Sequence, residues 1–464
     1  MTTLRSYRES DLPAVQRVWR ECGWVDDDDG AAAIAPFMAD ADALVATIDG
    51  EAEACVSVHR GTLLHTGTDL DLAAVTSVTT SRVARRQGLA RRLLAAGLAD
   101  AADDGAAVAV LGMFEQGFYD TLGFGTGAEM LFHRFDPATL DAGLPNRRPV
   151  RLGPEHAGEM AAAMARRSRA HGGVVLPQAS LCAAEMGLVG TSFGLGLRGA
   201  EGRLTHFVFG RVDDEHGPYR VSMWAFRDAH DLRELLGLVA SLGDQVRTVV
   251  LPEPAQAQLQ VLVRNPGRQE IARTSGPHRA GVSADTWWQA RILDLPACLA
   301  ALRTAGPQVA FDLVLVDPAG RWLPGDDDEG DDDDDSSDGD GDENGSSRPG
   351  DDGAEQDHDR ADDDRSDHAS DEDHADNGDR ARRWSGVGGE WHVRLGPDGS
   401  SAERGLRDAA LRLTCGVGTF TRLWLGVRSA SVLAATDDLE ASDELLEQLD
   451  AALRLPRPDV GMDF

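Results

Sequence analysis

The chain has 464 residues and a formal net charge of −34, and all 45 of its basic residues are Arg. A charge of this sign and size excludes nucleic acid and anionic membrane surfaces as natural partners. The first residues, MTTLRSYRES, lack an apolar signal core, and no uninterrupted run of about 18 apolar residues follows, so we expect a cytoplasmic protein of about three domains.

The first segment, residues 1–145, is predicted to form a mixed, twisted sheet with helices on both faces. Alternating and helically spaced apolar residues give its opening elements: an edge strand at Thr3–Tyr7, an amphipathic helix at Asp11–Trp24, and strands at Ala43–Ile48 and Glu53–Leu64 joined by the turn Asp49-Gly50.

A further strand at residues 70–80 runs into an R-x-x-G-x-A turn and then into a helix at Gly88–Asp104. The first amides of a helix have no partner inside it, so they point N–H donors and the positive dipole end at an anion. The motif alone is weak, because a chain this rich in Arg, Gly and Ala contains about one chance match. Its context favours a pyrophosphate site over a solvated helix face, with permanently charged donors at Arg82, Arg85, Arg86 and Arg91.

The next residues, AAVAVLGM (106–113) and FEQGFYDTLGFG (114–125), predict a buried strand and a short helix. The strand, the R-x-x-G-x-A turn, the second strand and the F-Y-x-x-x-G-F-G segment together resemble the GNAT superfamily of acetyl-CoA-dependent N-acetyltransferases. The resemblance implies acetyl-CoA as the acetyl donor.

The second segment, residues 146–286, repeats this order of elements. We expect a short strand at Arg147–Arg151, a helix at Glu155–His171, a hairpin within Leu204–Asp228, a helix at Asp231–Leu242 and a strand at Val246–Leu251. No R-x-x-G-x-[GA] turn follows its strand, so this GNAT-like segment is not expected to bind the cofactor.

The third segment, residues 287–464, is predicted to be a small α+β unit. Its elements are an amphipathic opening at Trp287–Leu302, a strand and turn at Val309–Leu323, a strand at Trp391–Leu395, the segments Ala409–Cys415 and Thr419–Leu425, and a helix at Glu444–Leu453.

An acidic insertion interrupts the third segment at residues 325–380. Residues 326–380 hold 27 acidic residues and four Arg, a local charge of −23, so the rest of the chain carries −11. Such a run cannot bury a core, and we expect it to be disordered and to loop out between two paired strands. Its His358, His368 and His374 could bind a metal, but a solvated run is favoured.

Three domains in this order resemble the Eis-like acetyltransferases, in which an active GNAT domain, a degenerate GNAT domain and a sterol-carrier-protein-like domain follow one another. The expected fold class is therefore α/β and α+β: tandem GNAT mixed-sheet domains followed by a small SCP2-like domain. The resemblance implies a general acid at Tyr119, a base at the C-terminal carboxylate of Phe464, and homo-oligomers of up to six chains. It also implies cofactor contacts at Val78, Thr79, Thr80, Arg85, Arg86, Gln87, Gly88, Leu89, Ala90 and Arg91.

Direct transfer of acetyl to an amine needs both of these groups. A base must deprotonate the ammonium, and an acid must protonate or stabilise the departing thiolate. A phenol with an ordinary pKa near 10 suits the second task, and an α-carboxylate suits the first if burial raises its low pKa or if it acts through a water. Tyr119 could instead be only a core residue, and Phe464 only a frayed end.

Carboxylates near the site could attract a cationic acceptor, and Asp26 and Asp463 are the candidates. The run Asp26–Asp29 could equally be a solvated loop. The sequence thus predicts an N-acetyltransferase acting on small polycationic amines or on protein amino groups. The alternative is a non-catalytic protein that senses CoA or binds lipid through the third domain.

Two features of composition indicate the protein's surroundings. Five Cys lie far apart without a C-x-x-C pair, which suggests a reducing compartment and no metal site. A chain without Lys and rich in Asp suggests a salty, halophilic cytoplasm, where salt screens like charges; a high-GC genome with one acidic insertion is the alternative.

Overall fold

The computed structural model describes residues 1–25, 28–143, 147–188, 190–255, 257–264, 279–323 and 384–461. The acidic insertion, with its predicted disorder and its three His, lies outside the described residues, as do Asp26, Asp463 and Phe464. In the described part of the chain, no helix is both long enough and apolar enough to cross a membrane.

The first sheet is mixed, and its main strand order is β1-β2-β3-β4-β5-β15-β6. Strands β4 and β5 are parallel and the other neighbours are antiparallel. The predicted edge strand and the hairpin through Asp49 and Gly50, both at positive φ, are confirmed. The strands are β1 (Thr2–Ser6), β2 (Asp42–Ile48), β3 (Glu51–His65), β4 (Thr68–Thr80), β5 (Val108–Gly112), β15 (Trp288–Ile292) and β6 (Gly125–Thr126), with β9 (Val174–Val175) paired to β3.

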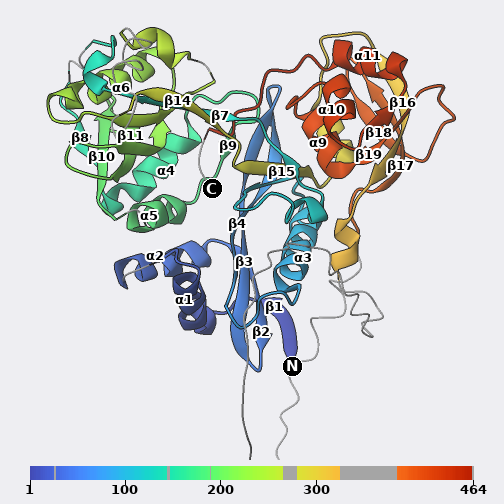
Figure 1. Ribbon diagram of the computed structural model, residues 1–464, viewed down its shortest axis with the longest axis horizontal. Coiled ribbons are helices and arrows are strands. Elements are labelled where there is room, and N and C mark those ends of the chain that lie inside the picture. Colours follow the sequence, from blue (N-terminus) through green and yellow to red (C-terminus); the bar gives the residue numbers. More distant parts are fainter. Residues whose placement is uncertain are drawn as a thin grey trace, which may run out of the picture. The chain divides into compact units, whose positions relative to one another are not determined.

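Helices cover both faces of this sheet, as predicted (Figure 1). Helix α3 (Leu89–Asp103) packs on one face against Val56 and Val58 of β3, and α1 (Leu12–Glu21) packs on the other against Cys55. Side chains of a strand alternate between faces, which is why neighbouring β3 residues enter different cores. Helix α2 (Asp28–Ala39) contributes to the same hydrophobic cluster as α1. The sequence analysis did not predict this helix, although its residues AAAIAPFMA form an apolar run.

The second sheet has the order β14-β7-β13-β12-β11-β10-β8. The predicted hairpin is β11 (Leu204–Val212) with β12 (Tyr219–Ala225), and the predicted helix after it is α6 (Ala229–Ser241). The predicted helix at Glu155–His171 is shorter, since α4 covers only Ala157–Ala165. The other elements are β8 (Val150–Arg151), α5 (Ala179–Leu188), β10 (Ser192–Arg198), β13 (Val249–Pro252), β14 (Gly281–Asp285) and β7 (Met130–Phe135).

Two strands cross the boundaries expected from sequence. β7 precedes residue 145 yet pairs with β13 and β14 of the second sheet, and β15 follows residue 287 yet pairs with β5 and β6 of the first. Between β6 and β7 the backbone of Gly127 lies against the Trp288 ring, where an added Cβ would lie 2.2 Å from a ring carbon. Because β7 and β15 each pair in the sheet of another segment, backbone hydrogen bonds link the chain segments to one another. The domain boundaries at residues 145 and 286 stay a prediction.

The third sheet has the order β18-β17-β16-β19-β20. β16 (Val309–Val316) and β17 (Gly389–Leu395) flank the insertion and pair antiparallel, from Val309 opposite Leu395 onward, so the predicted pairing across the insertion is confirmed. The remaining elements are α8 (Leu295–Ala301), β18 (Ser401–Arg404), β19 (Arg412–Gly416), α9 (Val417–Trp424), α10 (Ala430–Thr436), β20 (Glu440–Ala441) and α11 (Asp443–Ala452).

Candidate functional site

Strands β4 and β5 part at one end of the first sheet. Their pairing runs from Leu72 with Val108 to Val75 with Leu111, and β4 then continues to Thr80 along β3 alone. A bulge accompanies the parting: Ser77 has φ 47°, and its hydroxyl lies 2.6 Å from that of Ser57 on β3. A non-glycine residue rarely adopts this conformation, and such bulges recur where a strand is turned toward a site.

A cavity of about 430 Å³ lies where the two strands part. One wall is Val75–Val78 of β4, and another is Gly112–Phe114, which ends β5 and follows it. Tyr119 also lines the cavity, and Trp24, Phe132, Asp285 and Trp287 complete the lining. Sequence reasoning did not identify these last four residues as part of a site, because they come from three distant parts of the chain.

Tyr119 is buried and yet lines this cavity. It precedes the 3-10 turn Asp120–Leu122, which is shorter than the helix expected there, and its ring lies edge-on to those of Phe118 at 4.9 Å and Phe114 at 5.7 Å. Burial raises the pKa of its phenol well above the ordinary value of 10, so the hydroxyl is protonated at neutral pH. Tyr119 is therefore a core residue that also lines the cavity and whose hydroxyl is protonated at neutral pH.

The predicted phosphate turn has the backbone shape of an anion site. Arg86 and Gly88 both have positive φ, 61° and 69°, and Gly88 is the N-cap of α3. The unpaired first amides of this 15-residue helix thus follow the turn at residues 81–88, which connects β4 to α3. Arg85, Arg86 and Gln87 are exposed, Gly88 and Ala90 are half-buried, and Leu89 is buried.

Two of the predicted arginines have protein partners. The backbone N–H of Arg82 donates to Glu21 Oε2 at 2.7 Å. Arg91 donates from Nε to Thr121 Oγ1 at 3.2 Å, and its guanidinium lies over the rings of Phe118 and Trp322. Arg91 thus braces the Tyr119 segment against α3.

The predicted cofactor strand contributes Val78 and Thr80, which are half-buried, and Thr79, which is buried. The hydroxyl of Thr79 has no hydrogen-bond partner among the described residues. Only Val78 of the three lines the cavity.

A second cavity, of about 310 Å³, adjoins the first, since Trp24, Thr76 and Ser77 line both. Its lining includes aromatic and aliphatic side chains from α1, α2 and α5, namely Trp19, Phe37, Leu181 and Leu188. Arg167, which the sequence analysis did not single out, also lines it. No local pattern marks this Arg, because its surroundings come from three separate segments.

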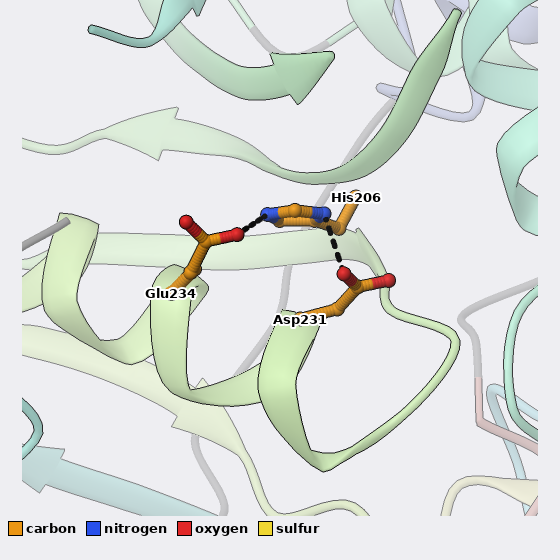
Figure 2. A group of neighbouring side chains, drawn as sticks. All are labelled: His206, Asp231 and Glu234. Carbon is orange, nitrogen blue, oxygen red and sulfur yellow. Dashed lines mark ion pairs between the residues drawn. The ribbon is translucent and has the colours of Figure 1, made fainter. Parts of the chain in front are cut away.

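Two overlapping groups of potential metal ligands lie around β11 and the start of α6: Asp228, His230 and Asp231, and the cluster of His206, Asp231 and Glu234 (Figure 2). Asp231 Oδ1 lies 3.2 Å from Nδ1 of His206, while Glu234 Oε2 lies 3.3 Å from Nε2 on the opposite side of the ring. Each carboxylate thus lies at a different nitrogen of the imidazole, as in two ion-pair contacts on opposite edges of one ring. Arg227 and Arg147 also pair with Asp231 and Glu234. The cluster therefore fits a clamp between β11 and α6 better than a metal site.

Comparisons with known proteins agree with this architecture. Residues 3–127 match the family model described as an acetyltransferase (GNAT) domain, and residues 383–460 match the sterol carrier protein domain. A sequence search among curated proteins finds no match.

Solved structures share the fold over the whole chain. A GCN5-related N-acetyltransferase from Kribbella flavida has a TM-score of 0.68 at 18% identity and covers 100% of this chain and 98% of its own. A GCN5-related N-acetyltransferase from Anabaena variabilis ATCC 29413 has a TM-score of 0.69 at 11% identity, and Eis1 from Mycobacterium abscessus 0.63 at 16%; both comparisons cover 100% of each chain. This chain thus carries an N-terminal GNAT acetyltransferase domain and a C-terminal sterol carrier protein domain, within the fold that Eis1 also adopts.

Proposed function

We propose that the protein is an acetyl-CoA-dependent N-acetyltransferase that acts on amino groups of a small molecule or a protein. The observation that carries this proposal is the cavity at the parting of β4 and β5, with a buried, protonated Tyr119 in its wall. The proposed anion site at the start of α3 follows β4 after the turn at residues 81–88, so one continuous stretch of chain would hold both ends of a thioester cofactor.

The proposed reaction is a direct attack of an uncharged amine on the thioester carbonyl. The C–N bond forms, the C–S bond breaks, and Tyr119 gives its proton to the departing sulfur. The C-terminal carboxylate of Phe464 takes the proton that the ammonium loses, directly or through a water. The nitrogen loses its second proton as the C–S bond breaks, and this proton returns through solvent to the Tyr119 phenolate. The carboxylic acid of Phe464 releases the proton it took, so the net products are the amide, the CoA thiol and one proton.

The proposed cofactor contacts follow the strand and the turn. Val78, Thr79 and Thr80 would lie along the cofactor, while the backbone N–H groups from Arg85 to Ala90 would hold its pyrophosphate, and Arg91 supports the turn. Asp26 and Asp463 would attract a cationic acceptor, either a small polycationic amine or a protein amino group. A cytoplasmic homo-oligomer, up to a hexamer, completes the proposal, and light scattering tests the assembly.

The test is the release of CoA thiol from acetyl-CoA with a panel of polyamines, aminoglycosides and lysine-bearing peptides in molar KCl. Two altered chains accompany the full chain: one lacks Phe464, and one carries an extra C-terminal Gly that keeps the Phe side chain but moves the carboxylate. Amine-dependent release that falls in both supports the reaction and its base. Binding of acetyl-CoA without release by any amine would favour the CoA-sensing or lipid-binding alternative.

A further inference from the structure

A third cavity, of about 830 Å³, lies on one face of the second sheet and is rich in arginine. Among the described residues, four guanidinium groups and only two carboxylates, those of Glu185 and Asp285, line it. The arginines are Arg134, Arg211, Arg220 and Arg279. Outside the acidic insertion the chain still carries −11, so this local excess of positive charge runs against its composition. A cavity of this size and sign favours a small anionic molecule.

Three of these arginines lie in one row across the sheet. Arg134 of β7 lies opposite Val250 of β13, which pairs with Arg220 of β12. Arg220 in turn lies opposite Arg211 of β11. Partners in neighbouring strands point to the same face, so the three side chains face the cavity together, and we call them the arginine row. Beyond Arg134 the row continues to Gly281 of β14, where an added Cβ would meet nothing within 4 Å, so that end is open.

The arginine row is not neutralised by its described surroundings. Like charges directly opposite each other destabilise a pair of strands. Arg211 and Arg220 both pair with Asp213, whose carboxylate oxygens lie 3.2 Å and 2.7 Å from their Nε atoms, so one negative charge offsets two positive ones. The hydroxyl of Ser222 also lines the cavity, and it is buried without a hydrogen-bond partner in the described part of the chain. A bound oxyanion would offset the remaining charge and accept from this hydroxyl.

The arginine cavity adjoins the proposed reaction site. Phe132 and Asp285 line both this cavity and the Tyr119 cavity. Asp285 ends β14, whose first residue, Gly281, lies in the arginine row, so the two positions are separated by roughly 13 Å along the strand. A carboxylate therefore lies at the end near Tyr119, and guanidinium groups lie at the other. This polarity fits a small molecule with an ammonium at one end and an oxyanion at the other.

The cofactor is a second possible source of an oxyanion, because CoA carries a phosphate on its ribose. None of the proposed cofactor residues between Val78 and Arg91 lines the arginine cavity. The turn proposed to hold the pyrophosphate connects β4 to α3, which belong to the first sheet and its covering helix. The cavity thus adjoins the place of the acyl transfer and not the proposed phosphate site. The observations favour the acceptor as the source.

We propose that the arginine row binds an oxyanion group, a carboxylate or a phosphate, of a small acceptor whose amine enters the Tyr119 cavity. This inference rests on the proposed function, and it narrows the acceptor from a polycation to an amine that also carries an oxyanion. Arg134 and Arg220 determine specificity, because forked donors match the paired oxygens of a carboxylate or a phosphate.

The kinetic test compares eight-carbon amines that differ only at the far end: octylamine, diaminooctane, ω-aminooctanoate and ω-aminooctyl phosphate. Charge-assisted hydrogen bonds should give the two oxyanion-bearing amines a kcat/KM about tenfold to a hundredfold above that of octylamine, and diaminooctane should fall below it. In Arg134→Met and Arg220→Met this advantage over octylamine should shrink about tenfold. Equal kcat/KM for all four amines, or an advantage that survives in both variants, would overturn the proposal.

Three further variants serve as controls. Arg151→Met removes an arginine from β8 of the same sheet, outside the cavity, and should keep the full advantage. Arg134→Lys retains the charge without the fork and should keep part of it. Arg279 is exposed and precedes β14, so Arg279→Gln should leave the sheet intact and still reduce the advantage. If the Met variants fail to fold in a urea titration, an undiminished advantage in both Arg134→Lys and Arg279→Gln decides against the arginine row.

A second measurement does not depend on catalysis. Calorimetric titration of the full chain with ω-aminooctyl phosphate, without acetyl-CoA, gives the Kd of this probe. Arg134→Met should raise the Kd about tenfold, and Arg151→Met should leave it unchanged. The same Kd in the full chain and in Arg134→Met would overturn the proposal. Lack of CoA release with every amine would refute the proposed function, yet the titration would still decide whether the row binds an oxyanion.

The cofactor alternative is tested with acetyl-dephospho-CoA, which lacks the ribose phosphate. If Arg134→Met raises KM for acetyl-CoA but not for this analogue, and the four amines keep their relative rates, the arginine row binds the cofactor and its assignment to the acceptor is wrong. An equal KM for acetyl-CoA in the full chain and in Arg134→Met supports the acceptor.

Discussion

Replacing Tyr119 by Phe removes one oxygen atom and isolates the proposed proton donor. The ring stays enclosed by Phe114, Phe118 and Phe124, and no hydrogen bond joins the hydroxyl to a described residue. The free energy of unfolding should therefore change by less than about 1 kcal/mol. Any larger effect on turnover must come from the lost proton.

General acid catalysis typically contributes about 10²- to 10⁴-fold, which is about 3 to 5 kcal/mol in activation free energy. We expect Tyr119→Phe to lower kcat by this amount. The loss should be constant from about pH 6 to 9, because the raised pKa keeps the phenol protonated throughout this range. The assay is CoA release at saturating acetyl-CoA, with urea unfolding measured on the same sample.

Tyr219→Phe is the matched control, since it removes the same hydroxyl from a tyrosine of the second domain that lies against Phe193. It should leave kcat unchanged. If Tyr119→Phe keeps a third or more of the wild-type kcat, the departing thiolate takes its proton from water and the reasoning about Tyr119 is wrong.

Three further predictions follow from the described contacts. Arg291→Met leaves the buried Asp317 carboxylate without its 2.7 Å partner, and should lower the free energy of unfolding by about 3–5 kcal/mol in a urea titration, whereas the exposed Arg203→Met should not. His59 is buried and its pKa is lowered to about 4, so between about pH 6.5 and 4 the unfolded chain binds more protons than the folded chain. The free energy of unfolding should therefore fall by about 3 kcal/mol as the pH is lowered through this window, and by less in His59→Gln. An equal pH dependence in the two chains, measured by urea unfolding, would contradict the assignment. Gly88→Val places a β-branched residue at φ 69° at the start of α3. In initial-rate measurements it should raise KM for acetyl-CoA with little change in kcat. An unchanged KM would mean that the pyrophosphate lies elsewhere.

The sequence determined the local elements near the site because their patterns are local. Alternation marked β4, a continuous apolar run marked β5, helical spacing marked α3, and the R-x-x-G-x-A motif marked the turn between β4 and α3. The aromatic segment around Tyr119 could also be identified from the sequence, although the short helix predicted there is a single 3-10 turn. Resemblance to a known domain order supplied the rest of the expected architecture.

Only the tertiary structure decided which strands share a sheet. β7 and β15 change places between the first two sheets, and nothing in MLFHRF or WQARI specifies a partner strand. The bulge at Ser77 likewise depends on the hydroxyl of Ser57 in the neighbouring strand. The surroundings of Arg167 join α4, β9 and the C-terminal segment, nearly 300 residues apart. Periodicity reports which face of an element is apolar, whereas pairing and counter-charges depend on long-range complementarity, which a single local pattern does not contain.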